Sequence, residues 1–191
     1  MIQYKKYYMP GTKEELLKTI DTIDCTYDIL AGGTDLYAKE KTPFNGADAA
    51  IDISGIKEFS VIKLKKEEGL ITFGSNICIQ QFLEEKVLME NVPILRHAAI
   101  YFADQQIREM ATVGGNVANS SPSGDTIAPL TALEAVIHTI TSKDNKICEK
   151  ETPITEFITG VGKNLLEKGE VISSITCPVL KEYGCAFKKV G

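Results

Sequence analysis

Two stretches of the sequence combine paired glycines with hydroxyl and amide side chains. Ile29 to Leu36 is ILAGGTDL, and residues 111–126 are ATVGGNVANSSPSGDT. Paired glycines let successive backbone N–H groups converge on an anion and leave room for a phosphate to approach. The hydroxyls of four neighbouring residues could add further donors: Thr34, Thr112, Ser121 and Ser123. Neither stretch is a dinucleotide-binding G-x-G-x-x-G or a P-loop. Two such stretches indicate a pyrophosphate held from two sides, and two purely structural turns remain the alternative.

Two charged residues beside the second stretch each allow two interpretations. Asp125 precedes the apolar run from Thr126 to Leu130, so it is either a helix N-cap or an acceptor for a ribose or ribityl hydroxyl. Arg108 either reaches a phosphate or a loop carbonyl, or forms a surface pair with Asp104 or Glu109. The residues alone leave both questions open.

Composition excludes several classes of function. The 191-residue chain has a formal net charge of -5, which gives no basic footprint for a nucleic acid. It has no apolar run long enough for a transmembrane helix, and its polar N-terminus lacks the apolar core of a signal peptide. Only two histidines occur, and the cysteines are isolated, so we expect reduced thiols, no metal site and a cytoplasmic protein. The cysteines are Cys25, Cys78, Cys148, Cys177 and Cys185.

The elements that would position the first stretch form a small α/β lobe. Thr12 and Glu15 have the spacing of a capping box, which predicts a helix over Lys13 to Thr22. Short apolar runs at 27–31 and 49–53 predict two buried strands. We therefore expect a small α/β lobe over residues 1–56.

The rest of the chain, residues 57–191, predicts a larger mixed lobe with an antiparallel sheet. A charged turn between two alternating runs predicts a hairpin, and apolar residues at helical spacing predict two helices separated at Pro93. Tyr101 and Phe102 end the second of these helices, where packing is the ordinary role of an aromatic residue. The remaining expected strands, with the hairpin first, are Val61–Lys65, Leu70–Gly74, Glu134–Thr141, Val171–Cys177 and Cys185–Val190.

The sequence resembles the FAD-binding (medium) subunit of the molybdenum hydroxylases, the family of xanthine dehydrogenase and the aerobic carbon monoxide dehydrogenase. The motifs AGGTDL and ATVGGNVANSSPSGDTIAPLTALEA carry the resemblance. Supporting matches are Ile51-Asp52-Ile53, Gln106-Ile107-Arg108 and Phe157-Ile158-Thr159-Gly160, so that the resemblance covers essentially the whole chain.

The resemblance implies an α+β fold of two lobes, as in vanillyl-alcohol oxidase and para-cresol methylhydroxylase, with FAD between them. It implies no catalytic acid or base in this chain. It also makes Phe102 a ring near the flavin, and we hypothesise that Lys188 is a positive group near reduced flavin. The implied cofactor contacts are Ile29, Leu30, Ala31, Gly32, Gly33, Thr34, Asp35, Leu36, Phe102, Thr112, Val113, Gly114, Gly115, Asn116, Ser121, Ser123, Gly124, Asp125, Ile172 and Lys188.

In the implied function, electrons pass from a molybdopterin-binding large subunit through [2Fe–2S] clusters on a small subunit to this FAD. They then leave to NAD+ or another acceptor. The family's C-terminal domain is expected to be absent, because the sequence stops three residues after Lys188. Two alternatives remain: a non-catalytic nucleotide-binding or scaffolding module that uses the same two glycine pairs, and a flavin reductase of the MurB-like fold, which would need its own catalytic acid.

Overall fold

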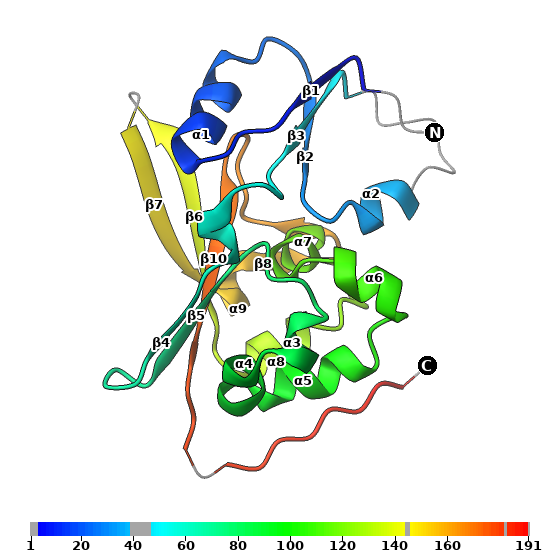
Figure 1. Ribbon diagram of the computed structural model, residues 1–191, viewed down its shortest axis with the longest axis vertical. Coiled ribbons are helices and arrows are strands. Elements are labelled where there is room, and N and C mark those ends of the chain that lie inside the picture. The colour runs from blue at the N-terminus through cyan, green and yellow to red at the C-terminus, as the bar shows by residue number, and fades with distance from the viewer. Residues whose placement is uncertain (1–3, 39–46, 144–145, 182, 191) are drawn as a thin grey trace.

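Two β-sheets of different construction organise the chain (Figure 1). The computed structural model describes residues 4–38, 47–143, 146–181 and 183–190. One sheet has three parallel strands in the order β1-β3-β2, and the other has five antiparallel strands in the order β4-β5-β10-β6-β7. This arrangement confirms the expected α+β class.

The three-stranded sheet and its helices form the N-terminal part of the fold. The predicted helix and both predicted strands are confirmed. Thr12 Oγ1 accepts the N–H of Glu15 at 3.2 Å, while the Glu15 carboxylate accepts the N–H of Gly11 at 2.7 Å, one residue before the cap. The elements are β1 (Lys6–Tyr8), α1 (Lys13–Thr22), β2 (Tyr27–Leu30), α2 (Thr34–Ala38) and β3 (Ala49–Asp52).

The five-stranded sheet contains the predicted hairpin and two of the three further predicted strands. Its edge strand β7 was not predicted, because its sequence KICEKETP is largely polar and mostly exposed. The strands of this part are β4 (Ile62–Lys65), β5 (Leu70–Gly74), β6 (Val136–Lys143), β7 (Lys146–Pro153) and β10 (Val171–Pro178), with a small separate pair β8 (Ile158–Gly160) and β9 (Lys163–Asn164).

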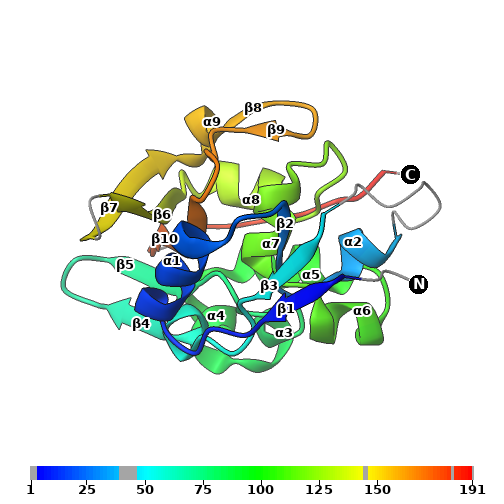
Figure 2. The ribbon, with the colours of Figure 1, turned by 90° about the horizontal axis from the view of Figure 1, so that it is seen from above.

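Short helices pack on the same part of the chain. The predicted break at Pro93 is confirmed, because this proline is the first residue of α5. The helices are η2 (Lys57–Ser60), α3 (Gln81–Glu84), α4 (Lys86–Asn91), α5 (Pro93–Ile100), α6 (Gln105–Met110), α7 (Val113–Asn119), α8 (Ile127–Ala132) and α9 (Ile154–Phe157). Figure 1 places α7 below the turn that leads from β2 to α2, and in Figure 2, which is seen from above, α7 lies close to β2.

The prediction of a strand at Cys185–Val190 is wrong. Residues 183–190 have no regular secondary structure, because a strand needs a hydrogen-bonding neighbour and no described strand pairs with this segment. The segment instead contacts the α5 region through side chains. The Phe187 and Tyr101 rings lie 6.1 Å apart between centroids, and Cys185 Sγ lies 3.8 Å from His97 Nδ1.

All five cysteines are free thiols, as expected. Burial raises the pKa of the Cys177 thiol to about 12, which keeps that side chain protonated and unreactive at neutral pH. Across the described residues, no helix has the length and apolar character needed to cross a bilayer.

One of the two hydrophobic cores is shared between the sheets. Leu16 and Ile51 from the N-terminal part pack in the same buried cluster as Phe59, Ile140 and Val171 from the rest of the chain. This core holds the small sheet against the large one. It crosses the boundary proposed near residue 56, and the division into 1–56 and 57–191 stays a proposal.

We expect Ile140→Ala to lower the free energy of unfolding by about 2–5 kcal/mol, because it opens a cavity in the shared core. The Ile140 side chain is only 1% exposed. Chemical unfolding followed by circular dichroism measures the change. Ile147→Ala on β7 is the matched control, since that side chain is 36% exposed and its loss should cost much less. Equal losses in both variants would contradict the importance of the shared core.

Candidate functional site

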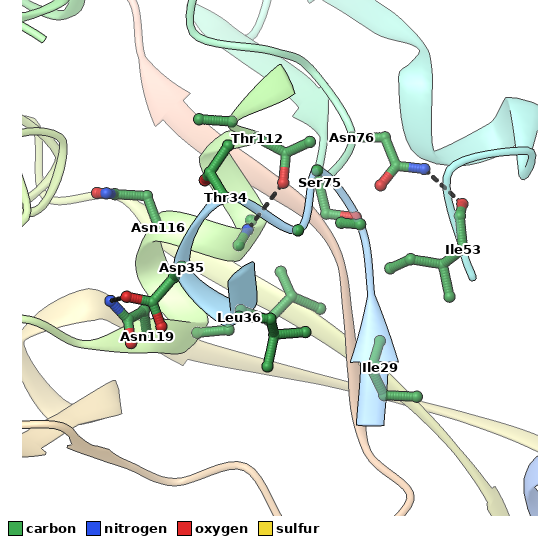
Figure 3. Close-up of a pocket in the computed structure, with 18 of the residues that line it drawn as sticks. Ile29, Thr34, Asp35, Leu36, Ile53, Ser75, Asn76, Thr112, Asn116 and Asn119 are labelled. Atoms are coloured by element: carbon green, nitrogen blue, oxygen red, sulfur yellow. Dashed lines mark hydrogen bonds between the residues drawn. The ribbon is translucent and has the colours of Figure 1, made fainter. Parts of the chain in front are cut away.

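A pocket of about 340 Å³ lies between the β2–α2 turn and α7 (Figure 3). Residues 75 and 76, which follow β5, and the first residues of β10 complete its walls. The pocket brings together residues more than a hundred positions apart in the sequence. Of the residues predicted to contact a cofactor, those that line it are Ile29, Ala31, Gly32, Gly33, Thr34, Asp35, Leu36, Phe102, Thr112, Gly114, Gly115, Asn116 and Ile172.

Seven predicted contacts do not line the pocket. The side chain of Val113 is fully buried in the core, and Leu30 is also buried. Lys188 is exposed on the segment after β10. The complete set outside the pocket lining is Leu30, Val113, Ser121, Ser123, Gly124, Asp125 and Lys188.

The first glycine pair forms the turn between β2 and α2. Gly33 has a φ of 70°, which an L side chain rarely adopts. A Cβ on Gly32 would lie 1.7 Å from the carbonyl oxygen of Met110, so that the turn touches the backbone at the end of α6. None of the described residues accepts a hydrogen bond from the N–H of Gly32 or Gly33. These two donors suit an anionic group in the pocket.

The second glycine pair was expected in a turn or loop, but it lies in the first turn of the helix α7. Thr112 caps this helix, and its Oγ1 accepts the N–H of Gly115 at 3.1 Å. The N–H of Gly114 donates to the carbonyl of Ser75 at 2.9 Å. The N–H of Asn116, the residue after the pair, donates to the carbonyl of Thr112. The expectation that these amides converge on an anion is therefore wrong, because each already has an acceptor within the protein.

The second glycine pair instead provides space. A Cβ on Gly114 would lie 2.5 Å from the Cβ of Ser75, which fixes how closely α7 approaches the residues after β5. Gly115 and Ala118 are exposed where α7 lines the pocket, so that beside the Asn116 and Asn119 side chains this wall leaves open space. A bulky planar or phosphorylated ligand can therefore approach the helix backbone.

A hydrogen bond joins the two sides of the pocket. The Asn119 amide nitrogen of α7 donates to Asp35 Oδ1 of α2 at 3.1 Å (Figure 3). One turn earlier on the same face of α7, Asn116 Oδ1 accepts the hydroxyl of Thr126 at 2.5 Å, which holds the segment after the helix. Side chains of α7 thus hold both α2 and the segment that follows α7.

The helix-cap interpretation of Asp125 is wrong. The N-cap of α8 is Thr126, and no side-chain capping bond is made there. The Asp125 carboxylate lies one residue earlier and pairs with Lys189 Nζ at 2.9 Å. The lysine that meets this carboxylate is therefore Lys189 and not its neighbour Lys188, which lies outside the pocket lining.

The Phe102 ring lines the pocket, and Arg108 holds the turn that carries it. Arg108 Nη1 donates to the carbonyls of Phe102 at 3.0 Å and Ala103 at 3.1 Å, which confirms the loop-carbonyl interpretation. The alternative surface pair is wrong: Asp104 caps α6 through the N–H of Ile107, and Glu109 accepts from a glutamine.

Sequence reasoning missed several residues of the pocket, of which Ser75 and Asn76 are the most informative. Asn76 Nδ2 donates to the carbonyl of Ile53 at 2.7 Å, but Asn76 Oδ1 and Ser75 Oγ are buried without a partner among the described residues. A serine and an asparagine after a strand are ordinary turn residues, so their sequence gave no signal. The other missed residues are Asp28, Ile53, Ala111, Ala118, Asn119, Leu166, Glu170 and Val171.

Comparison with known proteins decides the family. The family described as FAD binding domain in molybdopterin dehydrogenase matches residues 2–180. The chain belongs to this family of FAD-binding domains. FAD is therefore its cofactor, and the predicted resemblance is confirmed.

Individual relatives agree in sequence and in fold. The glyceraldehyde dehydrogenase medium chain of Sulfolobus acidocaldarius is 28% identical over 184 residues, which are 96% of this chain and 63% of that protein. The xanthine dehydrogenase FAD-binding subunit of Escherichia coli O157:H7 is 31% identical over 150 residues, covering 78% of this chain and 50% of the subunit. The carbon monoxide dehydrogenase structure from Hydrogenophaga pseudoflava superposes with a TM-score of 0.86 at 26% identity, covering 95% of this chain and 62% of that one. The chain thus spans between half and two thirds of these relatives.

The pocket fits FAD in its chemistry. Two N–H groups at Gly32 and Gly33 have no acceptor among the described residues, as a pyrophosphate site requires. Gly115 and Ala118 leave room on the α7 wall, and Phe102 adds an aromatic surface. The buried unpartnered atoms of Ser75 and Asn76 add polar groups that a ligand can satisfy.

We expect Gly32→Ala to destabilise the protein by about 1–3 kcal/mol, because the added methyl collides with a backbone carbonyl that no rotamer change can move. The FAD affinity should fall as well, since the turn shifts away from α6. Thermal unfolding and FAD titration measure the two effects. Gly55→Ala is the control, because nothing lies within 4 Å of its added Cβ. A Gly32→Ala protein as stable as the Gly55→Ala protein would refute the close contact.

Proposed function

We propose that this chain is the FAD-binding part of a molybdenum hydroxylase, an oxidoreductase component that passes electrons from iron–sulfur clusters to an acceptor. The observation that carries the proposal is the pocket between the two sheets, which both glycine pairs line. Family membership supports FAD as the ligand of this pocket.

In this proposal the residues of the chain bind and orient the cofactor. The free N–H groups of Gly32 and Gly33 hold the pyrophosphate. Thr34, the next residue in the chain, begins the helix α2. The Phe102 ring covers one side of a planar ring system, at a position that Arg108 fixes through the turn carbonyls. FAD supplies the redox chemistry when bound, and no side chain of the pocket is assigned as a general acid or base.

The partners and the acceptor follow from the same proposal. A molybdopterin-binding large subunit and a [2Fe–2S] small subunit deliver electrons, and NAD+ or another acceptor removes them, in the cytoplasm. Support comes from the relatives, which are medium chains or FAD-binding subunits of dehydrogenases. Copurification of both partners with this chain from its native source, identified by mass spectrometry, tests this part of the proposal.

We expect the purified chain to bind one equivalent of FAD and to acquire a flavin absorption spectrum. Dithionite should bleach this spectrum, and NAD+ should restore it under anaerobic conditions if NAD+ is the acceptor. Absorbance spectroscopy after gel filtration measures both. Protein that stays colourless after incubation with FAD would instead favour a non-catalytic module that binds another nucleotide or scaffolds partners.

We expect Ala118→Leu to weaken FAD binding by about tenfold or more, because the larger side chain fills the pocket from the α7 wall. Stability should change little, since this side chain is exposed and leucine is a good helix former. Isothermal titration calorimetry measures the affinity. Ala132→Leu in α8 is the matched control, an exposed helical alanine outside the pocket lining, and it should bind FAD normally. Equal FAD affinity of the two variants would exclude this pocket as the FAD site.

A further inference from the structure

Two adjacent side chains of the pocket each leave one buried polar atom without a partner. Ser75 Oγ and Asn76 Oδ1 have almost no exposed surface and no hydrogen bond among the described residues, and Ser75 as a whole is only 3% exposed. Both residues line the pocket (Figure 3). A buried polar group without a partner is rare in folded proteins, and each case requires an explanation.

Three backbone hydrogen bonds hold these two residues, so the unpartnered atoms are not the result of a loose turn. The N–H of Ser75 donates to the carbonyl of Ser173 at 3.0 Å, and the carbonyl of Ser75 accepts from Gly114 at 2.9 Å. The N–H of Asn76 donates to the carbonyl of Phe59 at 2.8 Å. Three neighbouring segments therefore fix the position of this pair.

The orientation of the Asn76 amide follows from its one hydrogen bond. Its nitrogen donates to the carbonyl of Ile53 at 2.7 Å, which only an N–H can do, so that the oxygen is turned away from Ile53 (Figure 3). Asn76 thus offers an acceptor, and the Ser75 hydroxyl can offer a donor beside it. A matching ligand edge carries a donor next to an acceptor.

We propose that Ser75 and Asn76 form a polar subsite for the edge of a nitrogen heterocycle that carries a hydrogen-bond donor beside an acceptor. This inference rests on the proposed function, because FAD has two edges of that kind. One is the amino edge of adenine, and the other is the N–H and carbonyl edge of the flavin ring. The Asn76 oxygen accepts from the ring donor, and the Ser75 hydroxyl donates to the ring acceptor.

The subsite predicts opposite effects of one substitution on stability and on binding. Ser75→Ala removes a buried hydroxyl that lacks a partner, so the ligand-free protein should melt about 2–4 °C higher. The same substitution removes a donor to the ligand, so FAD should bind about 3- to 10-fold more weakly. A purely structural serine would not produce this combination.

Ser173→Ala is the matched control. Ser173 is also a buried serine, on the neighbouring strand β10, but its hydroxyl donates to the carbonyl of His138 at 3.2 Å, and it does not line the pocket. Its replacement should lower the melting temperature of the ligand-free protein and leave the FAD affinity unchanged. Ser75→Cys, which keeps the size of the side chain and weakens its donor, should give an intermediate FAD affinity.

The experiment measures melting temperatures of the ligand-free 191-residue chain and dissociation constants for FAD, with ADP and FMN as competitors. Weaker competition by ADP alone in Ser75→Ala assigns the subsite to adenine, and weaker competition by FMN alone assigns it to the flavin. Unchanged affinity for FAD, ADP and FMN in Ser75→Ala would overturn the inference while leaving the proposed function intact. Failure of the wild-type chain to bind FAD would overturn the proposed function itself.

Discussion

The geometry of the pocket depends on two places where backbone meets backbone without a side chain between them. A Cβ at Gly32 would lie 1.7 Å from the Met110 carbonyl oxygen, and a Cβ at Gly114 would lie 2.8 Å from the Ser75 carbonyl oxygen. Only glycine allows either approach. The first contact sets the β2–α2 turn against the end of α6, and the second sets α7 against the end of β5. The width of the pocket is therefore determined by backbone packing and not by rotamers, as a preformed site requires.

The two glycine pairs have different structural roles although their sequences look alike. In the β2–α2 turn the amides of Gly32 and Gly33 have no acceptor in the described chain, so they are available to an anion. In α7 the amides of Gly114 and Gly115 are bonded to Ser75 and to the Thr112 hydroxyl, so that this pair contributes room rather than donors. A pyrophosphate in the pocket would thus find its backbone donors on the side of the small sheet.

Local signals in the sequence predicted much of the fold. The capping box predicted α1, the alternating runs predicted the β4–β5 hairpin, and Pro93 marked the start of α5. The helix α7 was missed because glycine is a poor helix former and V-G-G-N looks like a turn. Its formation depends on tertiary contacts, in which the carbonyls of Ser75 and Ile77 accept its first two N–H groups.

The positions of the site residues were harder to predict, because they depend on distant neighbours. The residue types of the first glycine pair predicted its place in the pocket, whereas Phe102 was predicted only from the family resemblance, because its position at a helix end favoured packing. Ser75 and Asn76 carry no motif, and their meaning comes only from burial without a partner. Lys188 was predicted to be a positive group near the flavin, but it lies outside the pocket lining, on a segment without regular structure whose side chains have no periodicity to orient them.

Backbone strain is concentrated at the same site, which supports the view that this pocket is the functional part of the molecule. Of the three described non-glycine residues with positive φ, Ala103 at 36° and Ser120 at 49° directly follow the pocket residues Phe102 and Asn119, and Glu134 lies elsewhere. Such conformations cost about 1–3 kcal/mol each and persist only where other contacts hold them. Here Arg108 holds the carbonyl of Ala103 at 3.1 Å, and a distant amide, Asn164 Nδ2, donates to Ser120 Oγ at 2.9 Å. Side chains of the adjacent helix α6 and of the distant strand β9 thus hold strained turns on both flanks of the pocket. We expect these turns and the unpartnered atoms inside the pocket to make the ligand-free site less stable than the core around it.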